Sequence, residues 1–163
     1  MSIVAGIRYK FRLKAPDGSV EEWESFNAMP DEGKTYCVGR IFSNGTDLIP
    51  TFYVGLCRAY SGGFRDNLGL PDIVGVEVSE YTGLDRPVWT PTLTTNATNA
   101  ASPAEFEFSS DSTGIANVFL CSQQTRGNSS GVLFSIAPVT PAAIAVSAGA
   151  VLQVTGAFEL RNI

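Results

Sequence analysis

Short runs in which apolar and polar residues alternate, separated by turn-forming residues, recur along the chain and constrain its fold most. The last run, residues 150–161, places Leu152, Val154 and Phe158 on one face and Gln153 and Thr155 on the other. No window of eleven or more residues keeps an apolar stripe of helical spacing free of Gly and Pro. With 16 Gly and 9 Pro available for turns, the pattern predicts an all-β protein, an antiparallel β-sandwich or jelly roll.

The N-terminal segment predicts a β-hairpin. Residues 9–14 alternate between apolar and cationic side chains, residues 16–19 (PDGS) have turn chemistry, and residues 20–26 form a second strand-like run. We expect one β-sandwich domain over residues 1–163, in which residues 1–19 form an N-terminal arm or extra strand. Further strands are predicted at residues 35–42, 50–60, 73–81, 87–93, 104–109, 114–123, 131–138 and 150–161.

Two connections are predicted to be long loops. Residues 61–71 (SGGFRDNLGLP) show no periodicity and are typical of a surface loop. Residues 94–103 (TTNATNAASP) are small and uncharged. A neutral segment of this kind is an unusual surface for a free cytosolic protein, whereas it would cause no difficulty if it were packed against a partner.

The charge balance excludes several classes of function. The chain has a net charge of −5 and a sequence pI near 4.6, which argues against binding of a nucleic acid backbone. It contains no histidine, which removes Ser-His-Asp and Cys-His catalysis and most catalytic zinc sites. Charged residues reach only 17%, against roughly 25% in an average soluble domain. A surface so poor in charge favours a protein that is largely covered by partners.

No segment resembles a secretory signal, because residues 1–10 lack a basic region followed by an apolar stretch. The longest weakly polar run, residues 142–152, is too short to cross a bilayer. We therefore expect a chain that is made in a cytoplasm and does not bind membranes. Cys37, Cys57 and Cys121 lack zinc-ligand spacing and have apolar neighbours, so they are predicted to be free thiols in the interior.

Three groups of residues are candidates for a catalytic or binding site. The carboxylates at residues 21–24 and 31–32 could serve a glycosidase, but adjacent residues of a strand face opposite ways, which favours a solvated cluster. Asp66, Asn67 and Asp72 fit no calcium-loop spacing. Trp23 and Trp89, with Tyr53, Tyr60 and Tyr81, could stack on a sugar, although aromatics at strand spacing are more typical of a core or an interface. We therefore predict no catalytic residue, no metal site and no cofactor.

In their order along the chain, several segments together resemble a group of small structural proteins of tailed-phage virions. The elements that carry the resemblance are residues 23–36 (WESFNAMPDEGKTY), 42–46 (FSNGT), 52–56 (FYVGL), 80–89 (EYTGLDRPVW), 101–108 (ASPAEFEF), 114–134 and 146–155 (VSAGAVLQVT). The chain departs from the group at Asn117 and Ala150 and carries residues 1–19 as an extension.

The resemblance implies a non-enzymatic jelly-roll cement or decoration protein on the outer surface of the phage head. Its implied partners are the major capsid protein and copies of itself, in a homotrimer. Two alternatives stay open: a tail, baseplate or fibre-associated subunit, and a carbohydrate-binding module. We expect residues 1–7 to act as an arm that can be removed without loss of the fold. The residues expected to contact the capsid or a neighbouring protomer are Met1, Ser2, Ile3, Val4, Ile7, Phe64, Arg65 and Leu68.

Overall fold

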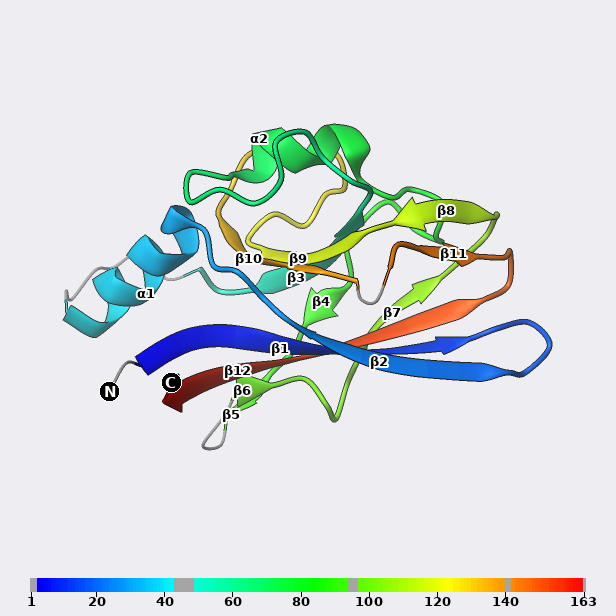
Figure 1. Ribbon diagram of the computed structural model, residues 1–163, viewed down its shortest axis with the longest axis horizontal. Coiled ribbons are helices and arrows are strands. Elements are labelled where there is room, and N and C mark those ends of the chain that lie inside the picture. The colour runs from blue at the N-terminus through cyan, green and yellow to red at the C-terminus, as the bar shows by residue number, and fades with distance from the viewer. Residues whose placement is uncertain (1–2, 43–48, 94–96, 140–141, 163) are drawn as a thin grey trace.

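The computed structural model describes residues 3–42, 49–93, 97–139 and 142–162, and its architecture is dominated by antiparallel strands (Figure 1). The larger sheet has six strands in the order β2-β1-β12-β6-β5, and β7 pairs with another part of β12. Its strands are β1 (Ile3–Lys14), β2 (Val20–Phe26), β5 (Thr92–Leu93), β6 (Ala97–Thr98), β7 (Ala104–Glu107) and β12 (Val151–Asn162).

A second sheet of four strands lies against the first. Its order is β10-β9-β3-β4, and its strands are β3 (Phe52–Cys57), β4 (Val88–Trp89), β9 (Asn117–Cys121) and β10 (Leu133–Pro138). A separate pair consists of β8 (Ser112–Ile115) and β11 (Ile144–Val146). The prediction of an all-β antiparallel sandwich is confirmed, whereas the strand order of a jelly roll stays a prediction.

The main core lies between the two sheets. The large sheet contributes alternate residues of β1, such as Ile7, Tyr9 and Phe11, and the small sheet contributes Val54 and Leu120. A second buried cluster lies on the other face of the small sheet, where Cys57, Phe119 and Cys121 pack under the segment that contains α2 (Leu70–Ile73). The small sheet is therefore covered on both faces, while the outer face of the large sheet carries the charged side chains of β1 and β2.

Of the two forms expected for the N-terminal extension, an arm or an extra strand, the structure shows a strand. β1 is an interior strand of the large sheet: it pairs with β12 from Ile3 to Lys14 and with β2 from Arg8 to Lys14. The predicted hairpin itself is confirmed, with residues 15–19 as its turn. Ile7 has no exposed surface, so the alternation that continues toward the N-terminus marks a core strand.

Residues 35–42 are a helix, which corrects a predicted strand. Helix α1 spans Asp31–Phe42, with acidic residues in its first turn and Arg40 in its last, the charge order that the helix dipole favours. Gly33 is buried near the start of the helix. A larger residue does not fit there, because a Cβ would lie 2.1 Å from the Phe134 carbonyl oxygen. Tyr36 and Cys37, one turn later, pack on the core. Because a glycine makes the closest contact of α1 with the core, the helix shows no apolar stripe free of glycine.

Residues 73–81 are the second correction. The segment starts with α2 and a 3-10 helix, η1 (Val74–Val76), and continues in irregular structure. Pro71 lies in the first turn of α2, and the Asp72 carboxylate accepts a hydrogen bond from the Gly69 N–H at 2.9 Å. These are helix-start signals, and they outweigh the β-branched residues that follow. Among the described residues, no helix is long and apolar enough to span a membrane.

Candidate functional site

Among the predicted contact residues whose side chains the structure describes, Phe64 is the most exposed. Its side chain is 44% exposed, whereas Ile7 and Leu68 are fully buried. The burial of these two corrects their assignment as contacts, because both side chains are part of the core. Arg65 is half-buried and forms an ion pair with Asp72. The structure does not test the prediction for the other four residues, because Met1 and Ser2 and the side chains of Ile3 and Val4 lie outside the described part of the chain.

Phe64 lines an apolar groove of about 480 Å³, here called the Phe64 groove. The groove lies where the chain segments around Ala28, Tyr60 and β10 meet, and no charged residue lines it. Its remaining lining residues are Ala59, Gly63, Ala116, Asn117, Ile136, Ala137, Pro138, Val139, Ala142 and Ala143. An uncharged concave surface of this kind suits the apolar side chain of a protein partner.

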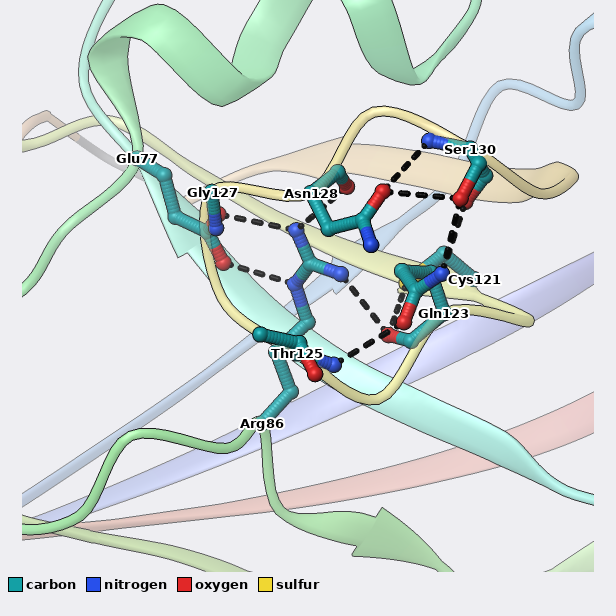
Figure 2. A network of polar contacts seen from close by, with 8 residues as sticks. All are labelled: Glu77, Arg86, Cys121, Gln123, Thr125, Gly127, Asn128 and Ser130. Carbon is teal, nitrogen blue, oxygen red and sulfur yellow. Dashed lines mark hydrogen bonds and ion pairs between the residues drawn. The ribbon is translucent and has the colours of Figure 1, made fainter.

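A buried ion pair forms the second notable feature, on the opposite face of the small sheet from the main core (Figure 2). The Arg86 side chain is fully buried and that of Glu77 is 3% exposed. The guanidinium binds the carboxylate in a bidentate manner, with Nε–Oε1 at 2.7 Å and Nη2–Oε2 at 2.8 Å. Arg86 also lies over the Phe119 ring, 5.4 Å from its centre. Both charges are thus satisfied inside the protein.

The ion pair also holds the loop of residues 123–131, here called the 123–131 loop. Arg86 Nη1 donates to the Gln123 carbonyl at 2.7 Å and Nη2 to the Asn128 carbonyl at 3.4 Å. The Gly127 N–H donates to Glu77 Oε2 at 2.7 Å. In Figure 2 the loop curves around the guanidinium, and its backbone groups point inward to the pair. Two side chains from a different part of the sequence therefore help to hold the loop in its conformation.

Several of the acidic residues named as candidates take part in ion pairs or hydrogen bonds. Glu22 pairs with Arg12, and Asp66 pairs with Lys34. Glu32 accepts a hydrogen bond from the Leu133 N–H at 2.8 Å. Within the part of the chain that the structure describes, no group of three or more His, Cys, Asp or Glu is placed to hold a metal ion.

Trp23 and Trp89 both pack with aromatic rings of the core. Trp23 stacks on Phe11 with ring centres 5.5 Å apart, and Trp89 packs edge-on against Phe52. Both tryptophans contact the main core, and Trp89 Nε1 donates to the Gly156 carbonyl at 3.3 Å. Trp23 keeps part of its surface on an outer groove that Glu22 and Gln153 also line, so the carbohydrate-binding alternative stays open.

The three cysteines are free thiols, and we expect them to differ sharply in reactivity. Burial raises the pKa of Cys57 to about 12 and that of Cys121 to about 11, and it also raises the pKa of the half-buried Cys37. Because the thiolate is the reactive form, a thiol reagent added to the native protein at pH 8 should label Cys37 slowly and leave the other two unmodified. Mass spectrometry of the labelled sites checks this, with unfolded protein, in which all three react, as the control. Rapid native labelling of Cys57 or Cys121 would contradict the placement.

Comparison of the chain with protein-family models, with curated proteins and with solved structures finds no match.

Proposed function

We propose that the chain is a non-enzymatic structural protein of a phage virion. In this proposal it is a capsid cement or decoration protein that binds the outer head surface across neighbouring major capsid protein subunits. A protein that binds only the assembled shell adds its binding free energy to the stability of that shell, so no catalytic group is needed. Assembly into a homotrimer is part of the proposal as an implication of the resemblance.

The observation that carries the proposal is the contact between two elements of the resemblance. Arg86 belongs to the element at residues 80–89, and its guanidinium binds the carbonyl groups of Gln123 and Asn128 in the element at residues 114–134. The element at residues 52–56 likewise lies in β3, which pairs with β9.

The Phe64 groove is the surface we assign to contact with the shell. It combines an exposed aromatic side chain with an uncharged lining, as in the apolar centre of a protein interface. The occupant is an apolar side chain of the major capsid protein, because a decoration protein must recognise that subunit rather than solvent or nucleic acid.

Copy number tests the proposal directly. Quantitative mass spectrometry of purified virions would compare this chain with the major capsid protein. Amounts within a few-fold of equimolar support a decoration layer, because only the shell offers hundreds of equivalent sites. A few copies to a few dozen would overturn the head location in favour of the tail subunit. Complete absence from the particle would overturn the virion role and return attention to sugar binding.

Replacement of Phe64 tests the assigned contact. Phe64→Ser should weaken binding to particles stripped of the protein by about 3- to 10-fold, because full burial of an aromatic side chain contributes roughly 1.5–3 kcal/mol and 44% of this side chain is left to bury. Its fold should be kept, since the ring is already 44% exposed. Leu93→Ser is the matched control, because Leu93 is 79% exposed on β5 and does not line the groove. Equal affinities for the Phe64 variant and wild type would remove the groove from the interface.

A further inference from the structure

Packing of the small sheet does not by itself require two charged residues, Arg86 and Glu77, in its interior. Two charges withdrawn from water lose their hydration, and well-packed apolar residues of similar volume often stabilise a fold equally well. Around the pair, Phe119 and Cys121 already form an apolar cluster with Leu133. The contribution that apolar residues could not make is the set of hydrogen bonds to the 123–131 loop.

Hydrogen bonds hold the loop at several points along its length. The Arg86 N–H donates to the Gln124 carbonyl at 2.9 Å, and the Arg126 N–H donates to the Leu84 carbonyl at 3.2 Å. Within the loop, the Asn128 side-chain oxygen accepts hydrogen bonds from the N–H and the hydroxyl of Ser130 at 2.9 and 2.7 Å. A loop held in one conformation loses little conformational freedom when a partner binds it.

The exposed residues of the loop are polar and uncharged, and the exposed Asp85 carboxylate beside them accepts a hydrogen bond from Gln124 Nε2 at 2.8 Å. Residues 124, 125 and 127–131 are exposed, and all of them are Gln, Thr, Gly, Asn or Ser. The one charged side chain of the loop, Arg126, lies over the Tyr81 ring with Cζ 4.6 Å from its centre and donates to the Tyr81 carbonyl. Leu84, whose backbone is bonded to the loop, is 78% exposed beside it.

We propose that the 123–131 loop, with Leu84, is a preorganised contact loop that binds an uncharged polar surface of the shell protein, and that Arg86 and Glu77 are its positioning residues. The identity of the partner rests on the proposed function; the positioning of the loop does not.

The deciding variant is the double substitution Arg86→Met with Glu77→Leu, which removes both charges and keeps the interior filled. We expect it to fold, with faster hydrogen exchange at the Gly127 amide and neighbouring loop amides and at least a 10-fold loss of affinity for stripped particles. The matched control is Arg58→Met with Glu80→Leu, which removes another Arg–Glu ion pair, one that is partly exposed and bonds to residues 112–113 rather than to the loop. It should leave loop exchange and binding unchanged.

Unchanged loop exchange in the folded double variant would overturn the positioning role, whether or not the chain binds a shell. Faster exchange with unchanged binding would overturn the contact role alone. If the wild-type chain itself does not bind stripped particles, the proposed function fails, and the exchange result still decides what the ion pair does. Should the double variant not fold, Ser129→Glu decides the contact role, because residue 129 is exposed. Its added charge should weaken binding at least 10-fold, and unchanged affinity would overturn the contact.

Discussion

Deletion of residues 1–7 is expected to unfold the protein, not to trim an arm from it. The deletion removes the first part of β1, which pairs residue by residue with the end of β12 from Ile3–Asn162 to Ile7–Phe158. It also removes the fully buried Ile7 side chain. Loss of a buried isoleucine side chain alone costs about 2–5 kcal/mol, and a small domain is stabilised by only about 5–15 kcal/mol in total.

Polar contacts add to the loss. The Ile7 N–H donates to the Asn27 side-chain oxygen at 2.5 Å, and the Asn27 N–H donates to the Ile7 carbonyl at 3.0 Å. Without residue 7, the buried Asn27 keeps neither partner, and an unsatisfied buried polar group costs about 1–3 kcal/mol. The deleted chain should therefore lack a cooperative thermal transition and the near-ultraviolet circular dichroism of packed aromatic rings.

Deletion of residues 1–2 is the matched control, because it leaves every pair between β1 and β12 in place. It should melt within a few degrees of the full chain. A deletion of residues 1–7 that melts as cooperatively as the full chain, and at a similar temperature, would contradict the central position of β1.

The fold class could be predicted from the sequence because alternation with a period of two is a local property. The run at residues 150–161 corresponds to β12 (Val151–Asn162), and the two alternating runs near the N-terminus correspond to β1 and β2. What alternation cannot give is the position of a strand within its sheet. An edge strand and an interior strand of the same antiparallel sheet show the same pattern, so the sequence predicts an arm or an extra strand for residues 1–19 and does not place it between β2 and β12.

The helix α1 was missed for a different reason. Its buried side is built on Gly33, which packs against the Phe134 backbone, and a glycine contributes nothing to an apolar periodicity. The acidic residues at its start and Arg40 at its end were signals that could have found it. The ion pair of the candidate site was missed because Glu77 and Arg86 are nine positions apart in a segment without regular structure, and nothing local shows that both are buried.

Replacement of Arg86 by methionine alone should be among the most destabilising single substitutions in the chain. The variant keeps the buried Glu77 carboxylate, which loses both of its guanidinium hydrogen bonds and retains the Gly127 N–H. Breaking a buried ion pair by removal of one partner costs about 3–5 kcal/mol. At roughly 2–4 °C for each kcal/mol in a domain of this size, the melting temperature should fall by on the order of 10 °C.

The single and double substitutions at this pair separate the cost of an uncompensated buried charge from the cost of losing the ion pair itself. If the cost of Arg86→Met comes from the uncompensated carboxylate, then adding Glu77→Leu should restore much of the stability, because no charge is then left buried. Chemical denaturation of the four proteins of this cycle measures the coupling between the two side chains. Arg58→Met is the control, and its cost should be smaller, about 1 kcal/mol or less for the ion pair itself, because that pair is partly exposed to solvent. A loss for Arg86→Met no larger than that of Arg58→Met would mean that water reaches Glu77 readily, and that the loop is not held by a desolvated pair.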